Sequence, residues 1–253
     1  MKLLRWSYAL ILVLMLMLSL SGIAVAKEKE KEKDSGGKNV DSGAFGVFMN
    51  GMRVGTETFS ITQTASGSVI QSKFKAEGSA GQAVQESELQ LTSSGEIRRY
   101  DWKEQSPGQA RSEVIPNEMF LTQKWTAGPQ DKEQEQPYLL PISTSILDDY
   151  FFVHREVMAW KYLASACKTE KGQVQCPMKQ KAQFGTLNPR QRTSAPASME
   201  FLGREKMMVS NVEKEMSKLE LKSETGSWLI WLDDQFKVLR ISIPAEKTEV
   251  VRD

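Results

Sequence analysis

From Ala44 onward, apolar and polar residues alternate along short runs separated by turn residues. Tyr100 and Trp102, for example, alternate with Arg99, Asp101 and Lys103. A period of two places one set of side chains on a dry face and the other on a wet face, as in antiparallel strands. Runs of this kind are predicted at 68–78, 83–93, 96–105, 111–116 and 117–125.

Ahead of these runs, the stretch "AFGVFMNGMRVGTETFSITQT" predicts a hairpin of two strands joined at Asn50-Gly51. Asn50-Gly51 is typical of a two-residue hairpin turn, in which both central residues need a positive φ. On the second strand, Met52 and Val54 have one parity while Phe59 and Ile61 have the other. One extra residue would reconcile the two sets, so we expect a β-bulge near Gly55.

A second group of strands is predicted at the C-terminal end, at 197–211, 212–224, 226–234, 236–243 and 247–252. Asp233-Asp234-Gln235 is typical of a hairpin loop. The run Trp228–Leu232 is apolar on both faces, which predicts a central strand or one packed against a helix.

Between the two groups the period changes to that of a helix, predicted over about 144–165. Ser145 and Asp148 have the spacing of a capping box, in which a hydroxyl and a carboxylate three residues apart satisfy the first free amides. At about 100° per residue, one apolar arc becomes the predicted helix core. Its members are Tyr150, Val153, His154, Val157 and Trp160.

The polar residues of this helix raise the question of an acid–base centre, because His154 is the single histidine of the chain. Asp148, Arg155 and Ala159 project from the side opposite the apolar arc, and Glu156 lies at its edge. No carboxylate stands three or four residues from His154, the spacing at which helical side chains meet. We therefore interpret His154 as a packing residue with one hydrogen bond, and predict no catalytic residue.

Taken together, the elements predict a mainly β (α+β) fold. We expect an open or half antiparallel β-barrel wrapped around this one principal helix, formed by residues 44–253 as a single domain. No unit recurs at a fixed period, so the chain is neither a propeller nor a solenoid.

The first 43 residues have a different composition. Lys2 and Arg5 precede a long apolar run that ends in Ala24-Val25-Ala26, which predicts a signal peptide over residues 1–26. An uncleaved membrane anchor is the alternative, since the run approaches bilayer length. Residues 27–43 begin with alternating Lys and Glu and are predicted to form a disordered charged linker.

The predicted signal peptide changes the net charge of the mature chain and indicates where the protein is located. The formal net charge is +1 for the whole chain and −1 once Lys2 and Arg5 are removed, which argues against a nucleic-acid partner. We expect an exported protein, periplasmic or extracellular, with no transmembrane segment after signal cleavage.

The two cysteines, Cys167 and Cys176, predict a structural disulfide in an exported chain. A redox centre would show Cys-x-x-Cys, and zinc would need more ligands than one histidine and two cysteines readily supply. The sequence also lacks the nucleophile elbow, the P-loop, the zinc-protease motif and the EF-hand loop. We therefore predict no metal site and no cofactor.

A resemblance emerges from "FGVFMNGMRVGTETFSI", from the amphipathic strands after it and from "ILDDYFFVHREVMAWKYL" ahead of further strands. This order of elements resembles a group of exported bacterial proteins of unknown function, similar in plan to the lipoprotein localisation factors. The resemblance covers most of residues 44–252. It implies an open antiparallel β-barrel with helix against its concave face and an apolar surface that holds an acyl chain, and it transfers no catalytic residue.

Three functions follow as hypotheses. The first is a non-catalytic envelope protein that binds a hydrophobic or lipid-like ligand in a concave sheet. The second is an interaction or scaffold module whose sheet edge or wet face meets another envelope protein. The third is a hydrolase, which lacks a visible nucleophile–base pair. A cavity open to solvent would favour the first, and a filled interior the second.

Overall fold

The computed structural model describes residues 37–78, 81–118, 120–170, 173–209, 212–224 and 226–253. The predicted signal peptide and most of the predicted linker lie outside these ranges. Gly36–Asp253 forms one compact unit. The helices within the described residues include none that is long and apolar enough to cross a membrane.

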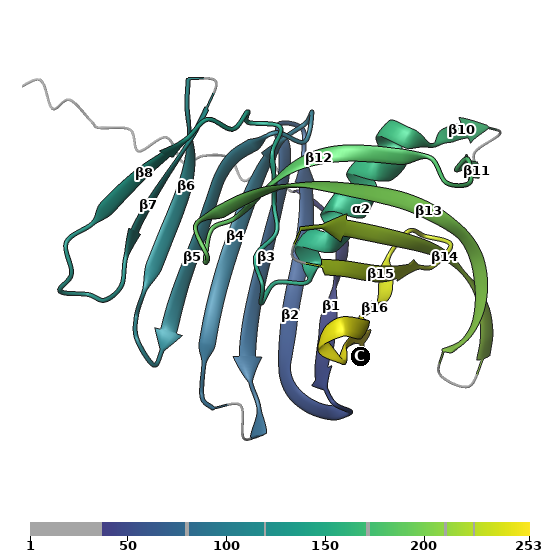
Figure 1. The fold of residues 1–253 in the computed structure, drawn as a ribbon, viewed down its shortest axis with the longest axis horizontal. Coiled ribbons are helices and arrows are strands. Elements are labelled where there is room, and N and C mark those ends of the chain that lie inside the picture. The colour runs from purple at the N-terminus through teal and green to yellow at the C-terminus, as the bar shows by residue number, and fades with distance from the viewer. Residues whose placement is uncertain (1–36, 79–80, 119, 171–172, 210–211, 225) are drawn as a thin grey trace, which may run out of the picture. The chain divides into compact units, whose positions relative to one another are not determined.

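One large sheet dominates the described residues (Figure 1). Its strand order is β8-β7-β6-β5-β4-β3-β2-β1-β17-β16-β15-β14-β13-β12-β9, antiparallel throughout except for the short parallel pair β9–β12. Because β8 and β9 form two separate ends, the sheet is not closed into a barrel. The strands are β1 (Lys38–Met49), β2 (Met52–Thr64), β3 (Gly67–Ala76), β4 (Val84–Thr92), β5 (Ile97–Ser106), β6 (Arg111–Asn117), β7 (Phe120–Thr126), β8 (Gln134–Tyr138), β9 (Ser145–Ile146), β12 (Lys181–Asn188), β13 (Thr193–Val209), β14 (Val212–Ser223), β15 (Gly226–Leu232), β16 (Val238–Ile243) and β17 (Thr248–Arg252).

The remaining elements of the described residues are one α-helix, α2 (Val153–Ala166), a small hairpin of β10 (Lys168–Glu170) and β11 (Gln173–Gln175), and the 3-10 turn η2 (Pro244–Glu246). The expectation of a mainly β protein with one principal helix is confirmed for the described residues. Consecutive strands pair as hairpins in each half of the sheet, and the halves join where β1 pairs with β17.

The first hairpin has the predicted turn. Asn50 and Gly51 have φ of 50° and 80°. The pairing register shifts between Val47↔Gly55 and Phe48↔Arg53, which leaves Val54 as the extra residue of a bulge. The predicted bulge near Gly55 is therefore confirmed, and it reconciles the two parities of apolar residues on β2.

The sheet begins earlier than the predicted boundary at residue 44. β1 starts at Lys38, so residues 38–43 of the expected linker are a strand. The physical reason is Asp41, which is 1% exposed and accepts hydrogen bonds from both terminal nitrogens of Arg252, at 2.9 and 2.7 Å. This pair ties the start of the domain to its last strand.

The helix starts nine residues later than predicted. Ser145 belongs to β9, which pairs with β12, and the predicted capping box does not form. Instead the Glu57 carboxylate on β2 accepts hydrogen bonds from the amides of Phe152 (2.7 Å) and Val153 (3.3 Å). A side chain distant in sequence therefore caps the helix.

The predicted helix core needs corresponding corrections. Val153, His154 and Val157 are buried, as expected. Tyr150 precedes the helix and is 39% exposed, because the chain enters α2 only at Val153. Trp160 is half-buried, and its indole N–H donates to the Phe236 carbonyl (2.7 Å).

The side of α2 that was expected to be polar is also buried. Arg155, Glu156 and Ala159 are no more than 3% exposed, as is Asp148 just before the helix. The reason is that the sheet packs on both sides of α2: β2 contacts its start through Glu57, and β16 contacts it through the Val238 amide, which donates to Glu156 (3.2 Å). Figure 1 shows α2 lying between the two halves of the sheet.

The predicted disulfide is confirmed. Cys167 and Cys176 are joined at an S–S distance of 2.05 Å. Cys167 caps the end of α2 and Cys176 follows β11, so the bond closes the β10–β11 hairpin against the helix.

Candidate binding groove on the polar face of the sheet

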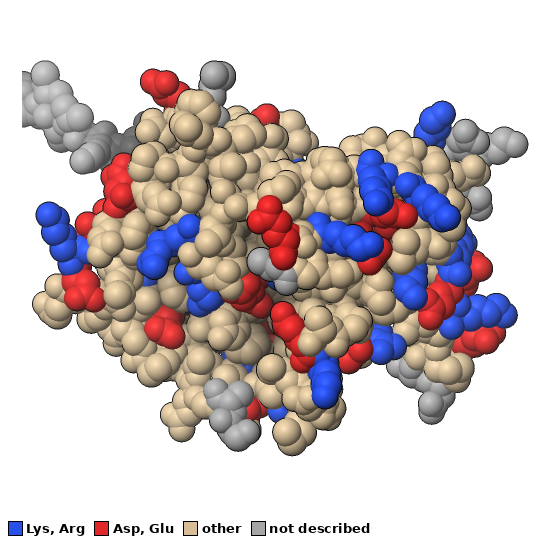
Figure 2. Space-filling model, viewed as in Figure 1, with Lys and Arg blue, Asp and Glu red and all other residues tan. Residues whose placement is uncertain are grey.

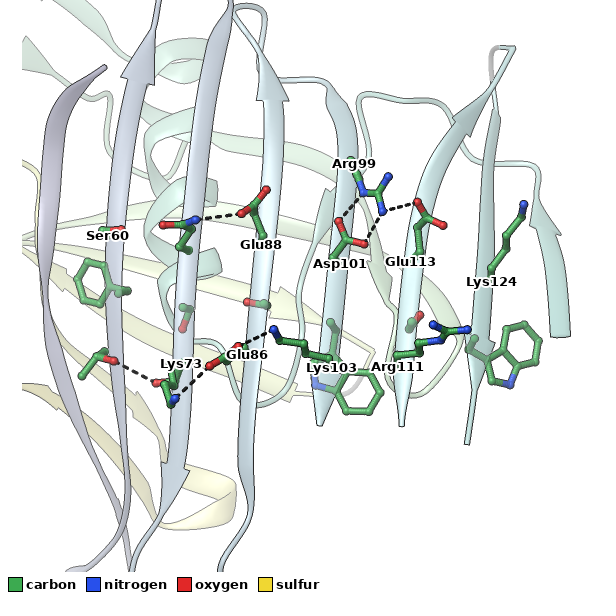
Figure 3. A pocket seen from close by; sticks show the side chains of 18 of the residues that line it. Ser60, Lys73, Glu86, Glu88, Arg99, Asp101, Lys103, Arg111, Glu113 and Lys124 are labelled. Atoms are coloured by element: carbon green, nitrogen blue, oxygen red, sulfur yellow. Dashed lines mark hydrogen bonds and ion pairs between the residues drawn. The ribbon is translucent and has the colours of Figure 1, made fainter. Parts of the chain in front are cut away.

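A groove of about 770 Å³ runs across strands β2 to β7 on the face of the sheet that points away from α2 (Figure 3). Alternation along each strand produces it, because every second side chain turns toward the interior. The interior side chains form one register row beneath the groove, namely Phe59, Ser72, Ser87, Trp102, Ser112 and Trp125. Their backbone is the floor.

Two rows of outward side chains are the walls of the groove. We call the first the basic row, formed by the register neighbours Lys73, Glu86, Lys103 and Arg111. We call the second the acidic row, formed by Gln71, Glu88, Asp101, Glu113 and Lys124. The rows are two residues apart along each strand, or about 6.8 Å.

The order of charges within each row is unusual for a solvated sheet. Lys103 lies directly opposite Arg111, and Asp101 lies directly between Glu88 and Glu113. Like charges placed opposite each other destabilise a sheet, and an ordinary surface alternates them. On the face shown in Figure 2, by contrast, positive and negative side chains lie close to one another. Each row is therefore enriched in one sign, with Glu86 as the one carboxylate of the basic row and Lys124 as the one cation of the acidic row.

Ion pairs hold these rows in place. Glu86 bridges Lys73 (3.0 Å) and Lys103 (2.9 Å), and these hydrogen bonds lower the pKa of its carboxyl. Arg99 reaches into the acidic row and contacts Asp101 and Glu113. Such exposed pairs contribute roughly 0–1 kcal/mol each, so an incoming charged group exchanges with them at little cost.

The cations at the far end of the groove are the most loosely held. Arg111 and Lys124 contact Glu133 and Glu135 at 3.8 and 3.9 Å, near the limit for an ion pair. The Arg111 side chain is 67% exposed and that of Lys103 62%. This end of the basic row is open to a ligand's anionic groups.

A second hollow, of about 420 Å³, lies on β12 and β13 and is lined by Phe184, Pro196 and their neighbours. It carries no charged side chain. It offers nothing that would orient a polar ligand.

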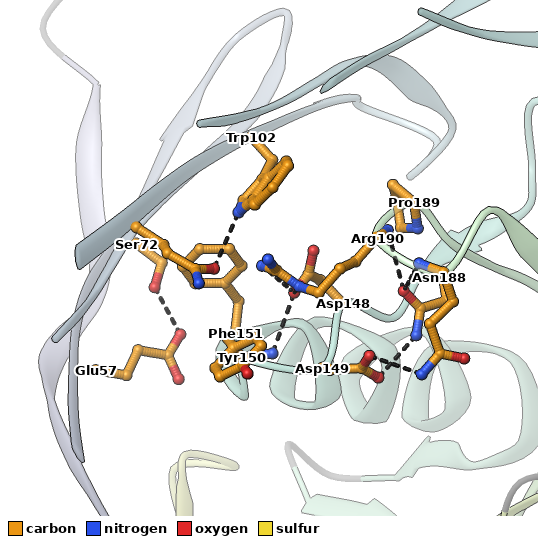
Figure 4. Close-up of polar contacts among 12 residues, drawn as sticks. Glu57, Ser72, Trp102, Asp148, Asp149, Tyr150, Phe151, Asn188, Pro189 and Arg190 are labelled. Carbon is orange, nitrogen blue, oxygen red and sulfur yellow. Dashed lines mark hydrogen bonds and ion pairs between the residues drawn. The ribbon is translucent and has the colours of Figure 1, made fainter. Parts of the chain in front are cut away.

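Beneath the sheet, a buried polar cluster fixes the two halves around the start of α2 (Figure 4). Asp148 is fully buried and accepts hydrogen bonds from the Tyr100 hydroxyl (3.0 Å) and from Arg190 Nη2 (3.0 Å) and Nε (3.2 Å). The Arg190 guanidinium lies between the rings of Trp102 (4.3 Å) and Tyr150 (4.5 Å). This residue comes from the β12–β13 turn, so it joins the C-terminal half to β5.

The same turn makes two further contacts with the N-terminal half. Gln123 of β7 donates to the Pro189 carbonyl (2.6 Å), and Arg192 lies over Trp125 at 5.0 Å. Trp102 and Trp125 belong to the interior row, so the turn supports the floor of the groove from below.

Three buried groups have displaced pKa values, each chiefly because burial disfavours the charged form. Burial raises the pKa of Glu57 to about 7, although Ser72 and two helix amides donate to it. Burial, with the neighbouring Asp41, raises the pKa of Glu156 to about 9. Burial lowers the pKa of His154 to about 3.

Asp41 has the opposite shift. Burial alone would raise its pKa, but the cations Arg252 and Lys237, together with the neighbouring Glu156, outweigh burial and bring the pKa to about 2. At neutral pH Asp41 is therefore ionised and its neighbour Glu156 is protonated. This pair lies where β1 meets β17 and α2.

His154 does not have the hydrogen bond that the sequence led us to expect. Neither ring nitrogen has a partner among the described residues. The ring instead meets Tyr100 edge-on at 5.6 Å and Phe151 at 5.9 Å. It remains a packing residue, in keeping with the interpretation from sequence.

Away from both hollows, the side chain of Lys161 lies close to the hydroxyl of Ser145, a residue type that can act as a nucleophile. The Lys161 ammonium donates to the Ser145 hydroxyl (3.2 Å) and to the Ser143 carbonyl (3.0 Å). Ser145 is 7% exposed, and neither hollow described above is lined by it. The contact positions β9 and gives no access to a substrate. The described residues also contain no group of three acidic, histidine or cysteine side chains able to hold a metal ion.

Comparisons with family models, with curated proteins and with solved structures find no match to this chain.

None of the predicted helix-core residues and neither cysteine lines the groove. The predicted core residues Tyr150 and His154 lie at the buried cluster through Arg190 and Tyr100, while Cys167 and Cys176 lie at the other end of α2. Sequence reasoning missed the groove itself. The available signal was the set of outward charges on successive hairpins, which line up once each strand register is known.

Proposed function

We propose that this chain is a non-catalytic exported interaction module that binds another envelope protein in the groove between the acidic and basic rows. The observation that carries the proposal is the sorting of charge: like charges stand side by side across strands, at a cost in stability that a purely structural surface would avoid. The Cys167–Cys176 disulfide supports an oxidising compartment such as the periplasm.

The filled interior supports this function over the lipid-like ligand. Phe151, Val153 and Met158 are no more than 1% exposed and pack with both halves of the sheet. An acyl chain would have to displace this core. Kinship in plan with the lipoprotein localisation factors, including their open-barrel curvature, stays part of the proposal; the order of strand meander, helix and second meander supports it.

Photo-crosslinking in the native envelope tests the proposal. A photoreactive residue at Lys103, in the groove, should yield a discrete protein adduct, while the same residue at Met52, which is 66% exposed on the first hairpin, should not. Adding Arg111→Glu should abolish the adduct in chain that still melts cooperatively. Absence of an adduct at Lys103, or equal adducts at both positions, would show that the groove is not a partner site.

A further inference from the structure

The groove has a polarity that specifies what kind of partner segment fits it. Its walls differ in their main charge: the basic row has three cations around Glu86, and the acidic row has three carboxylates, with Lys124 at one end and Arg99 paired to two of them. A ligand that bridges them must present anions along one edge and cations along the other. Figure 3 shows the labelled side chains of the two rows facing the open side of the sheet.

An extended polypeptide provides this arrangement when its charges alternate. Successive side chains of an extended chain point to opposite sides, so a Lys-Glu repeat has all of its cations on one edge and all of its anions on the other. A helix would not do so, because residues one or two apart do not share a face. Charge order, rather than net charge, is therefore what the groove distinguishes.

The length of the groove sets the length of the segment. From β2 to β7 there are five strand spacings of about 4.8 Å, which gives about 24 Å. An extended chain advances about 3.3 Å per residue, so roughly seven residues span the groove. The segment lies across the strands, and its backbone adds no strand to the sheet.

The geometry points to an extended segment of about seven residues with alternating basic and acidic side chains as the occupant of the groove. This inference rests on the proposed function and names the chemistry of its partner. Cations of the segment meet Glu88, Asp101 and Glu113, and its anions meet Lys73, Lys103 and Arg111. The exposed pairs that now neutralise these residues exchange for intermolecular ones.

Titration of the compact unit Gly36–Asp253, which omits the chain's own Lys-Glu repeat at residues 27–33, with two dye-labelled heptapeptides tests this inference by fluorescence anisotropy at low salt. The first is Lys-Glu-Lys-Glu-Lys-Glu-Lys, and the second has the same composition in blocks, Lys-Lys-Lys-Lys-Glu-Glu-Glu. The alternating peptide should bind at least about tenfold more tightly than the block peptide. Its affinity should fall at least about tenfold in 0.5 M salt, where exposed charges are screened.

Matched variants locate the binding. Lys103→Glu with Arg111→Glu should remove binding of the alternating peptide. Arg204→Glu with Lys206→Glu makes the same change of charge on the β13–β14 hairpin, where both residues are exposed and paired with glutamates, and should leave binding unchanged. Circular dichroism melts verify that both variants are folded.

Two outcomes would overturn the inference: equal affinity for the two peptides, or no binding of either. The proposed function would survive both, because the adduct at Lys103 is measured without any peptide. Loss of that adduct with retained peptide binding would sink the proposed function instead.

Discussion

At the scale of single residues, His154 shows how burial decides the role of a titratable side chain. The imidazole is 1% exposed, has no hydrogen-bond partner among the described residues, and packs against Tyr100. Burial lowers its pKa from 6.5, the value of an exposed histidine, to about 3. The ring therefore stays neutral at every physiological pH. An uncharged ring of this kind contributes packing and no proton chemistry.

Replacing this ring gives the first prediction. In the unfolded chain His154 is protonated below pH 6.5, whereas in the folded chain it is protonated only below about pH 3. The free energy of unfolding therefore falls as the pH is lowered from 6.5 to 3. At pH 5 the loss is about 2 kcal/mol. His154→Phe removes this loss, and its urea midpoint should change less between pH 7 and pH 5 than that of the wild type. An unchanged acid dependence would mean that His154 titrates normally.

Glu156 is a second residue whose role the helical pattern misjudged. It is fully buried, its Oε2 accepts a hydrogen bond from the Val238 amide, and its Oε1 has no hydrogen-bond partner among the described residues. Because its pKa is raised from 4.5 to about 9, stability falls as pH rises through that window.

Glu156→Gln tests whether Glu156 is protonated in the folded chain. Glutamine keeps an acceptor for the Val238 amide but cannot ionise. The variant should be about as stable as wild type at pH 5 and clearly more stable at pH 9, measured by urea unfolding at both values. Greater loss of stability in the variant at pH 9 than in the wild type would contradict the raised pKa of Glu156.

At the scale of elements, the helix shows what a sequence pattern can and cannot predict. The 3.6-residue period of Val153, His154 and Val157 located α2 correctly. Its start was wrong by nine residues, because Ser145 and Asp148 match a capping box locally while β9 pairs with β12, forty residues further on. Local sequence patterns indicate the period of an element and the type of turn. They do not indicate with which distant strand a segment pairs.

The groove was missed for a related reason. The alternation in each strand predicted a wet face, and the Asn50-Gly51 turn and its bulge were predicted in register. Whether Asp101 stands beside Glu88 or one pair away depends on the bulges within β4–β5, which shift the pairing at both ends of that hairpin. A slip of one residue would turn the charges to the other face.

The cap of α2 by Glu57 is testable at this scale. Glu57→Ala leaves two helix amides and the Ser72 hydroxyl without their acceptor, which should cost about 3 kcal/mol or more. Glu86→Ala, on the opposite face of the same sheet, should cost less than about 1 kcal/mol. Urea unfolding of both variants decides; equal losses would mean that the Glu57 contacts contribute little.

The turn that carries Arg190 provides another prediction, because it links the halves of the sheet. Arg190→Lys keeps the charge but loses the paired contact with Asp148 and the stacking between Trp102 and Tyr150. We expect a loss of about 2 kcal/mol, because one charge-assisted hydrogen bond is lost and the contacts with the two rings weaken. Chemical denaturation measures the loss, and faster amide exchange in β12 and β13 than in β2 and β3 would show that the link has opened. Arg204→Lys, at an exposed pair, is the control.

At the scale of the whole molecule, the buried ionisable groups act together at the places where the halves of the sheet meet α2. Glu57 caps its start, Asp148 binds the turn of the C-terminal half, and the Asp41–Glu156 pair lies where β1 meets β17. Burial keeps Glu156 protonated at neutral pH, and the partners of Asp41 keep it ionised. The pH dependence of folding stability therefore reports on the contacts that hold α2 between the two halves of the sheet.

The sign of each shift fixes the pH of greatest stability. Glu57, raised to about 7, and Glu156, raised to about 9, both lower stability as pH rises above 4.5. His154, lowered to about 3, reduces stability as pH falls below 6.5, and Asp41, lowered to about 2, adds to this loss below 3.8. The effects of the glutamates and of the histidine oppose each other between pH 4.5 and 6.5.

The melting temperature should therefore pass through its maximum in this mildly acidic range and decline toward both pH 3 and pH 9. Differential scanning calorimetry in buffers of constant ionic strength measures the profile. Glu156→Gln should flatten the alkaline side and His154→Phe the acidic side, so the variants assign each limb to its residue. A melting temperature that rises steadily from pH 5 to pH 9 would contradict this. It would mean that Glu57 and Glu156 ionise in the folded chain without loss of stability, as solvated carboxyl groups do.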